Sequence, residues 1–326
     1  AMRMADLLHE PLGKTVGYQI RNERVAGPST RIMVMTEGIL TRKIQNDPEL
    51  SEVGLVIFDE FHERNLHSDL GLALCLEAAD VLRPDLRILV MSATLETGAV
   101  KGLLGDAGVI RSDGRSWPVT TVYRQVKTAD RNWGAFERDC AAQVMRALEN
   151  DEGDILVFLP GAGEIGRVYD LLRQTIQSGS ISIHPLYGNL TRKDQDAAIG
   201  PSLPGCRKIV LATSIAETSL TIEGVRVVVD GGLMRVPRYD SGYAMGRLTT
   251  VPVSRASADQ RRGRAGRLGP GVCYRMWTED EQALHPEFNT PEILQADLTR
   301  LVLELALWGV ASHDELKWLD PPPNGA

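Results

Sequence analysis

The chain has 326 residues, 43% of them hydrophobic and 24% charged, which is typical of a globular protein with about two domains. No apolar run approaches the length of a membrane span and no secretory signal opens the chain, so we expect a cytoplasmic protein. The net charge of −7 argues against a generally basic nucleic-acid binder. The four cysteines are scattered without a C-x-x-C pair, which indicates neither a zinc site nor a disulfide framework.

Apolar strand-like runs alternate with amphipathic helical stretches, which predicts an α/β fold with parallel sheets covered on both faces. In the first half, a helix is expected over 69–82 and strands at 16–20, 31–35, 55–58 and 86–91. In the second half, a helix is expected over 136–149 and strands at 154–159, 181–185, 208–212 and 226–229. Turn residues between β-prone runs predict a hairpin over 234–254, and residues 292–309 form a separate amphipathic helical stretch.

Gly and Pro residues tend to end helices and strands, so the stretch 114–118, which begins with Gly and ends with Pro, predicts a domain boundary. We expect a first domain over residues 1–118 and a second over 119–287 that includes the hairpin. Residues 288–326 would begin a further C-terminal region.

The apolar run 54–58 ends in the sequence DEFH, which begins with Asp59 and Glu60. A run of this length fits a buried parallel strand, and ligands of open α/β sheets bind beyond the carboxyl ends of the strands. One carboxylate can hold Mg²⁺ and its neighbour can polarise an attacking water. Two acidic residues at the start of a loop are common, so this pair alone is weak evidence for a catalytic site. The evidence becomes strong with SAT at 92–94, which follows a second apolar run.

Residues 260–267 read QRRGRAGR, with Arg261, Arg264 and Arg267 three residues apart. At helical spacing their guanidinium groups share one face, and the Gly and Ala residues between them leave no bulk in the way. Such a face suits oxyanions, because the arginine fork matches phosphate. An arginine that reaches a γ-phosphate in the transition state is a known catalytic device. The alternative is a solvated basic patch or a contact with an RNA backbone.

DEFH, SAT and QRRGRAGR occur in the order found in the DEAH-box helicases of superfamily 2, and the chain resembles that family over essentially its whole length. Further segments match the family: VGY with Arg21, TEGIL at 36–40, FLPG at 158–161, TSIAETSLTI at 213–222 and LDPPP at 319–323. DEFHER at 59–64 and LYG at 186–188 are most similar to the bacterial HrpB branch. The resemblance implies two RecA-like domains followed by the start of a winged-helix domain.

The resemblance also implies an ATP-dependent RNA helicase core, in which ATP hydrolysis drives 3′-to-5′ translocation on RNA or its unwinding. ATP would lie between the two domains, with Mg²⁺ held through Asp59, and loss of the γ-phosphate would open the cleft. Glu60 would be the general base and Gln260 would position the attacking water. Arg264 and Arg267 would be arginine fingers.

The remaining roles that the resemblance implies concern coupling, nucleotide binding and RNA binding. His62, with Ser92 and Thr94, would couple the nucleotide site to domain motion. Nucleotide binding would involve Ser92, Thr94, Thr221, Glu223 and Leu233. Single-stranded RNA would be held through its backbone by Thr36, Gly38 and Thr218. The hairpin over 234–254 lies where the family places a hairpin over the RNA channel.

Two positions depart from the family pattern. Leu233 stands where many members carry an aromatic residue that stacks on the adenine, and Ser214 stands where an Asn is usual. A leucine packs against a base without a stacking face, so preference for ATP over other nucleotides is open.

One segment of the chain resembles the P-loop sequence G-x-x-x-x-G-K-[ST] but does not match it. Gly13-Lys14-Thr15 imitates its end, but Leu8 stands where the first glycine belongs, and a β-prone run follows instead of a helix start. The resemblance places the true P-loop before Ala1. We therefore expect an N-terminally truncated chain that does not hydrolyse ATP by itself.

Two other functions remain open from the sequence. The same core serves RNA-binding clamps or remodelling ATPases that do not unwind, and it also serves DNA helicases. Motifs for hydrolysis do not separate these three functions, whereas strand displacement with RNA and DNA duplexes does.

Overall fold

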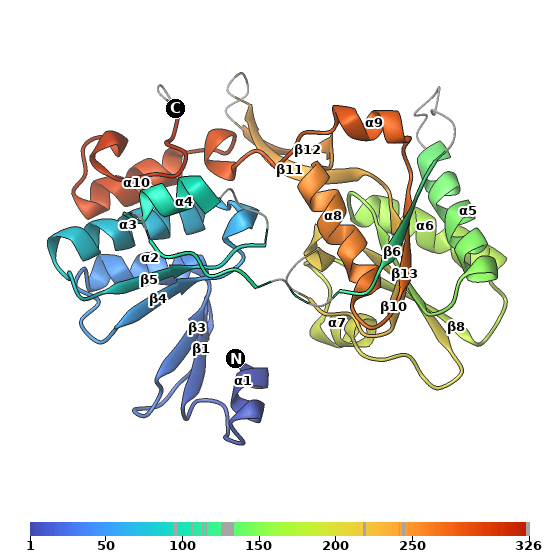
Figure 1. Ribbon diagram of the computed structural model, residues 1–326, viewed down its shortest axis with the longest axis horizontal. Helices are drawn as coiled ribbons and strands as arrows, with labels where there is room; N and C mark the ends of the chain where they lie inside the picture. Colours follow the sequence, from blue (N-terminus) through green and yellow to red (C-terminus); the bar gives the residue numbers. More distant parts are fainter. Residues whose placement is uncertain are drawn as a thin grey trace. The chain divides into compact units, whose positions relative to one another are not determined.

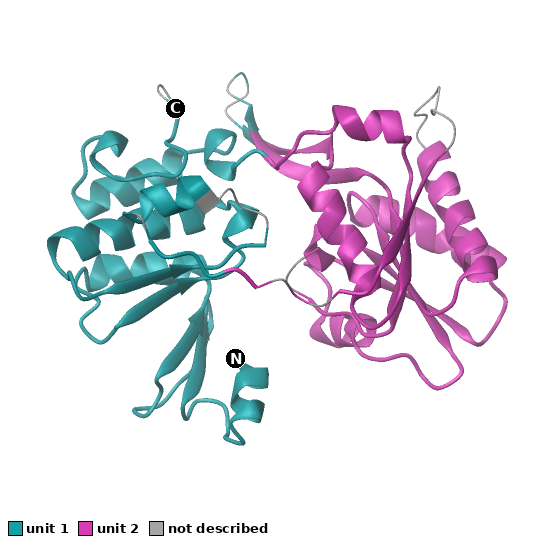
Figure 2. Ribbon diagram, viewed as in Figure 1, with its two compact units in different colours: residues 1–110, 239–246, 290–326 teal, residues 111–238, 247–289 magenta. Residues whose placement is uncertain are grey.

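The computed structural model shown in Figure 1 describes residues 1–93, 97–105, 107–112, 114, 116–124, 134–217, 220–240, 242 and 245–323. The chain groups by its internal contacts into two compact units (Figure 2). Unit 1 comprises residues 1–110, 239–246 and 290–326, and unit 2 comprises 111–238 and 247–289. The domain limits expected from the sequence remain a prediction. Among the described residues, no helix is long and apolar enough to cross a membrane.

Unit 1 begins with alternating helices and strands. They are α1 (Met2–Leu7), β1 (Val16–Ile20), β2 (Glu23–Val25), β3 (Ile32–Met35), α2 (Glu37–Asn46), β4 (Leu55–Phe58), η1 (Phe61–Glu63), α3 (Leu66–Val81), β5 (Arg87–Val90) and α4 (Thr97–Leu103). β1 pairs in parallel with β3, and β4 pairs in parallel with β5, as the apolar runs predict. β2 pairs with β1 in the antiparallel sense and was not predicted, because its three residues are mostly exposed and show no apolar alternation.

The near match to a P-loop has a different structure. Gly13 adopts φ +93° and donates its N–H to the main-chain oxygen of Val16 at 2.7 Å. The Lys14 ammonium lies 3.0 Å from a carboxylate oxygen of Glu10. Strand β1 follows at once, so this segment is a turn into a strand and not a phosphate cradle at a helix start.

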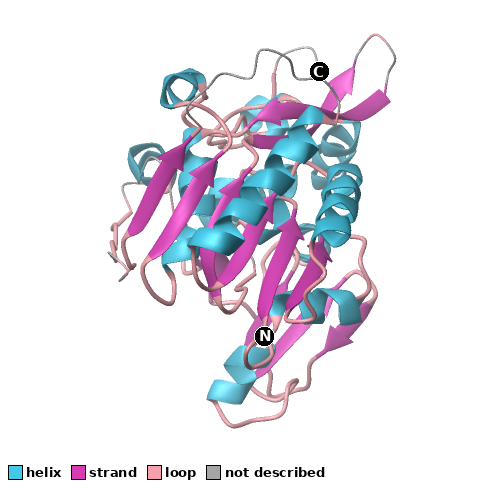
Figure 3. Ribbon diagram, turned by 90° about the vertical axis from the view of Figure 1, so that its right-hand side faces the viewer, coloured by secondary structure: helices cyan, strands magenta, loops and turns pink. Residues whose placement is uncertain are grey.

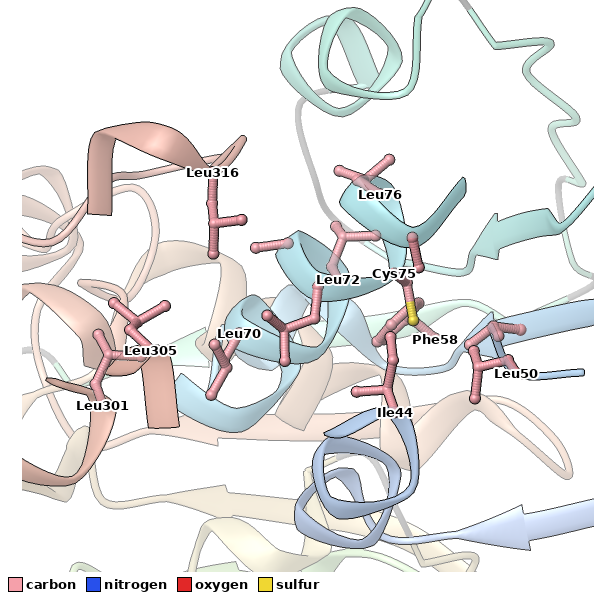
Figure 4. Packing of buried hydrophobic residues seen from close by; sticks show 14 of the residues in the cluster. Ile44, Leu50, Phe58, Leu70, Leu72, Cys75, Leu76, Leu301, Leu305 and Leu316 are labelled. Atoms are coloured by element: carbon pink, nitrogen blue, oxygen red, sulfur yellow. The ribbon is translucent and has the colours of Figure 1, made fainter. Parts of the chain in front are cut away.

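Helix α3 is the centre of the unit 1 core and is buried around most of its circumference. Figure 4 shows Leu72 and Cys75 of α3 near Ile44 of α2, with Leu301 and Leu305 from the C-terminal segment in the same cluster. Residues far apart in the chain thus build one core. Burial of such side chains contributes about 1.5–3 kcal/mol each.

The C-terminal segment consists of η4 (Glu292–Leu294), α10 (Thr299–Trp308) and η5 (His313–Glu315). The sequence predicts one helical stretch over 292–309, but the structure interrupts it. The 3-10 turn η4 ends at Leu294, and α10 begins only at Thr299, whose main-chain N–H donates to the Asp297 carboxylate at 2.9 Å. This segment packs on the unit 1 core, and its assignment to a winged-helix domain remains a prediction.

Unit 2 holds the remaining elements. They are β6 (Val119–Tyr123), α5 (Ala135–Asn150), β7 (Asp154–Phe158), α6 (Ala162–Thr175), β8 (Ile181–Leu186), α7 (Arg192–Ile199), β9 (Arg207–Ala212), η2 (Ser214–Ala216), β10 (Val225–Asp230), β11 (Leu233–Asp240, whose last two residues group with unit 1), β12 (Met245–Pro252, whose first two residues group with unit 1), α8 (Arg255–Gly263), η3 (Arg264–Gly266), β13 (Gly271–Arg275) and α9 (Glu279–Leu284). β11 and β12 form a two-stranded sheet where the sequence predicts a hairpin.

The main sheet of unit 2 has the strand order β6-β13-β10-β7-β9-β8, and each neighbouring pair is parallel (Figure 3). Alternate residues along β7 enter two different cores. Ile155 and Val157 pack with α5 and α6, whereas Leu156 and Phe158 pack with residues of α7, η2 and η3. The predicted α/β architecture with parallel strands covered on both faces is therefore confirmed here.

Candidate functional site

The DEFH segment of unit 1 turns sharply at the carboxyl end of β4. Glu60 adopts the left-handed conformation, φ +50°, which is uncommon for a residue with a side chain. The Asp59 carboxylate accepts the main-chain N–H of Glu60 at 2.9 Å through Oδ1. Asp59 is exposed and Glu60 is partly exposed, so this turn holds two carboxylates beyond the edge of the sheet.

His62 connects this turn to the SAT segment that follows β5. The main-chain N–H of Ala93 donates to His62 Nδ1 at 3.3 Å, and His62 Nε2 lies 3.4 Å from Glu60 Oε2. Among the described residues, His62 Nε2 is buried without a hydrogen-bond partner and lies near the Glu60 carboxylate. The structure thus brings together residues from the ends of two neighbouring parallel strands. Ser92 is exposed beside Ala93, and Thr94 lies outside the described residues.

Thr36 and Gly38 begin helix α2 at the end of β3. Thr36 is the N-cap residue, and it is exposed. A Cβ atom on Gly38 would meet nothing within 4 Å, so the space beside this first turn is open. The N–H groups of a first helical turn lack acceptors within the helix and suit oxyanions. Thr218, the third predicted RNA contact, lies outside the described residues.

In unit 2, all three spaced arginines of the QRRGRAGR run bind described residues between β9 and β10, namely Glu217, Leu220 and Thr221. Arg261 Nε lies 2.7 Å from Glu217 Oε1. Arg264 Nε lies 2.7 Å from the Glu217 main-chain oxygen, and Arg264 also donates to the Leu220 main-chain oxygen. Arg267 Nη1 lies 2.7 Å from Thr221 Oγ1. The arginines therefore share one face, as their spacing predicts.

That face is less open than the small residues of the run suggest. Arg261 is 1% exposed and Arg264 is 6% exposed, whereas Arg267 is exposed. Gly266 is small because of packing: a Cβ atom there would lie 2.6 Å from the main-chain oxygen of Trp117. The expectation that small residues leave Arg264 unobstructed is thus wrong, since Arg264 is buried. Gly266 instead allows the close approach of η3 to the chain before β6.

Two family models match the chain. The one described as "DEAD/DEAH box helicase" matches residues 6–101, and the one described as "Helicase conserved C-terminal domain" matches residues 139–269. The chain is 48% identical over 323 residues to the ATP-dependent RNA helicase HrpB of Escherichia coli (strain K12), and covers 39% of that protein. A crystal structure of the E. coli DEAH/RHA helicase HrpB superposes with a TM-score of 0.91 over 99% of this chain and 40% of that one. The chain belongs to the DEAH-box helicase family.

A human relative extends the likeness beyond bacteria. The probable ATP-dependent RNA helicase DHX34 of Homo sapiens is 38% identical over 321 residues, which are 95% of this chain and 28% of that protein. The DEAH-box chain described here thus spans well under half the length of the relatives that it matches.

The acidic turn of this DEAH-box chain fits Mg²⁺. Mg²⁺ prefers oxygen ligands and keeps several waters, so one or two carboxylates with substrate phosphates are sufficient. Asp59 provides an exposed carboxylate at a strand end. Within the described part of the chain, no group of three or more His, Cys, Asp or Glu side chains is arranged to hold a metal by itself.

The other predicted nucleotide residues of the DEAH-box chain lie in unit 2. Gln260 is partly buried on α8, and Thr221 and Glu223 are exposed in the segment before β10. Leu233 is partly buried at the start of β11, and its main-chain oxygen lies 3.4 Å from Arg261 Nη1. The structure therefore connects Leu233 to the arginine run.

Sequence reasoning did not single out Glu217, Asp230 and Ser257, which surround Arg261. Ser257 Oγ lies 2.7 Å from Glu217 Oε2, and Arg261 Nη1 lies 2.8 Å from Asp230 Oδ1. One signal was available: an arginine inside an otherwise packed helix face needs buried acidic partners. Which carboxylates those are depends on the fold.

Proposed function

We propose that the protein is an ATP-dependent RNA helicase that couples ATP hydrolysis to 3′-to-5′ movement along RNA and to its unwinding. The proposal rests on the hydrogen bond between the Ala93 N–H and His62, which joins the DEFH turn to the SAT segment. Such a contact would couple the site of ATP hydrolysis to the SAT segment and, through it, to domain motion. The matched relatives carry the name ATP-dependent RNA helicase.

In unit 1, Asp59 would hold Mg²⁺ and Glu60 would accept the proton of the attacking water. Bound Mg²⁺ neutralises the charge that develops on the phosphate oxygens. The left-handed turn at Glu60 keeps its carboxylate 3.4 Å from His62 Nε2, so the imidazole lies beside the proposed base. A change in charge at Glu60 would be felt by His62 and, through it, by the SAT segment.

In unit 2, Gln260 would orient the water, and Arg264 and Arg267 would stabilise the transferring phosphoryl group. Arg267 is exposed and would have to leave the Thr221 hydroxyl. Arg264 would have to exchange its bonds to the carbonyls of Glu217 and Leu220 for phosphate oxygens. Thr221, Glu223 and Leu233 would line the rest of the nucleotide site.

RNA would be bound as a single strand through its backbone. Thr36 and Gly38 offer the first turn of α2 to a phosphate, and Thr218 would add a contact from unit 2. The β11–β12 hairpin would separate the strands. Contacts to the backbone carry no sequence information, so the proposal includes no preferred RNA sequence.

The test is strand displacement by the full-length protein on RNA and DNA duplexes with either a 3′ or a 5′ overhang. We expect ATP-dependent displacement of RNA with the 3′ overhang. The Glu60→Gln variant should still bind ATP but turn it over about 10²-fold more slowly, which is typical for loss of a general base. Near-normal turnover by this variant would place the base elsewhere.

The other outcomes separate the alternative functions. RNA-stimulated hydrolysis without displacement of any duplex would contradict unwinding and identify a clamp or remodelling ATPase. Displacement of DNA in preference to RNA would identify a DNA helicase. Equal displacement from both overhangs would contradict the direction of movement.

A further inference from the structure

Arg261 is the most deeply buried cation that the structure describes in the QRRGRAGR run. It is 1% exposed and lies with its guanidinium carbon 4.8 Å from the centre of the Phe158 ring. Its Nε binds Glu217 and its Nη1 binds Asp230, at 2.7 and 2.8 Å. Glu217 is 8% exposed and Asp230 is 0% exposed. One guanidinium thus joins two buried carboxylates.

Stability alone does not account for this cluster. Buried ion pairs are often no more stabilising than apolar residues of the same volume, because the ions lose their hydration. Here two carboxylates face one guanidinium, and among the described residues Asp230 Oδ2 has no hydrogen-bond partner. Burial by itself lowers the pKa of Arg261, but attraction by Glu217 and Asp230 outweighs it and raises that pKa, so the group stays charged.

The three charged residues belong to the three segments that carry the proposed nucleotide contacts of unit 2. Glu217 precedes Thr221 by four residues, and its main-chain oxygen accepts from Arg264. Asp230 precedes Leu233 by three residues, and Asp230 Oδ1 also accepts the N–H of Gly232 at 2.9 Å. Arg261 itself precedes Arg264 by one helical turn. A shift of any one segment would therefore strain the bonds to the other two.

We infer that Arg261 is a positioning residue, which through Glu217 and Asp230 fixes Arg264, Thr221 and Leu233 relative to one another. The inference rests on the proposed ATPase function and adds to it a residue that touches no substrate. The rigid planar fork is what the role needs: it donates in fixed directions to Glu217, to Asp230 and to the main-chain oxygen of Leu233.

The neighbouring Arg262 provides a matched control. Its side chain is 41% exposed, and its Nε lies 3.6 Å from Asp259 of the same helix. It bridges no other segment in the interactions that the structure describes. Lysine keeps the positive charge at either position. At Arg261, however, it removes the guanidinium that joins α8 to the segments of Glu217 and Asp230.

The experiment compares Arg261→Lys with Arg262→Lys in the full-length protein, as steady-state ATPase kinetics at saturating RNA. For Arg261→Lys we expect kcat per folded molecule to fall about 10²-fold, the typical cost of a small misplacement of catalytic groups, with KM for ATP within about threefold. RNA affinity without nucleotide should not change. Arg262→Lys should retain wild-type kinetics.

A purely structural role predicts another pattern. Arg261→Lys would then lower the midpoint of thermal unfolding while kcat per folded molecule stays within twofold of the wild type, and this result would overturn the inference. Ser257→Ala covers the case in which Arg261→Lys does not fold. It removes only the 2.7 Å bond that holds Glu217 Oε2, so we expect a correctly folded variant with kcat about fivefold lower. An unchanged kcat would contradict positioning. A wild-type protein without RNA-stimulated ATPase would remove the proposed function and this inference together.

Discussion

Replacing Arg264 and Arg267 singly by alanine separates catalysis from structure at the arginine run. Arg264→Ala leaves the main-chain oxygens of Glu217 and Leu220 without their guanidinium donor. An unpaired buried polar group costs about 1–3 kcal/mol, so we expect a loss of about 2–6 kcal/mol in the free energy of unfolding. Arg267 is exposed and makes a bond to the Thr221 hydroxyl, so its replacement should cost under about 1 kcal/mol.

Catalysis should respond differently from stability. If both residues stabilise the transferring phosphoryl group, each variant should lower turnover by about 10³-fold, the lower end for an arginine finger. The measurements are RNA-stimulated ATPase, thermal unfolding and RNA affinity without nucleotide, all on the full-length protein. Arg262→Ala is the control and should leave all three quantities near the wild type.

Two results would refute the reasoning. If both variants weaken RNA binding and flatten its salt dependence while ATPase at saturating RNA stays intact, the run is a basic patch. If Arg264→Ala lowers turnover without any loss of stability, its bonds to the two carbonyls do not support the fold.

Two further predictions concern unit 1. Burial, opposed by Arg64, raises the pKa of Asp69 to about 6. The folded state then binds a proton more tightly than the unfolded state, so stability that is present below about pH 4 is lost as the pH rises through about 6. In urea unfolding across this pH range, we expect the free energy of unfolding of the wild type to fall by about 3 kcal/mol. The Asp69→Asn variant should not show this fall, and parallel pH profiles of the two proteins would contradict the prediction. Leu305→Ala should destabilise α3 by about 2–5 kcal/mol in amide hydrogen exchange, because Leu305 is 6% exposed in the core around α3. Leu303→Ala, at a position that is 65% exposed, is the control, and equal losses at both positions would show that α10 does not pack as described.

Most strands and the longest helices were predictable from the sequence. The apolar runs at 16–20 and 55–58 correspond to β1 and β4 as the structure has them, and the run at 181–185 is one residue shorter than β8. These predictions succeed because a run of apolar residues bounded by turn residues favours a strand through neighbours in the chain. The run does not show how deeply the strand is buried: along β4, Val56 and Phe58 are buried, whereas Leu55 and Ile57 are exposed. The placement of DEFH and SAT at adjacent strand ends follows in turn from the parallel pairing of β4 with β5.

The sequence by itself thus determined most of the strands, though not β2, β6 and β13, and it determined which residues belong to the family motifs. Only the tertiary structure decided how charged side chains are used, because their partners are distant in the chain. Arg261 and Glu217 are 44 positions apart, and Glu292, which accepts the N–H of Leu66, is 226 positions from it. No periodic pattern encodes such pairs. Arg264 appeared unobstructed in the sequence and is buried in the fold, since the burial of a side chain depends on the segments that pack over it.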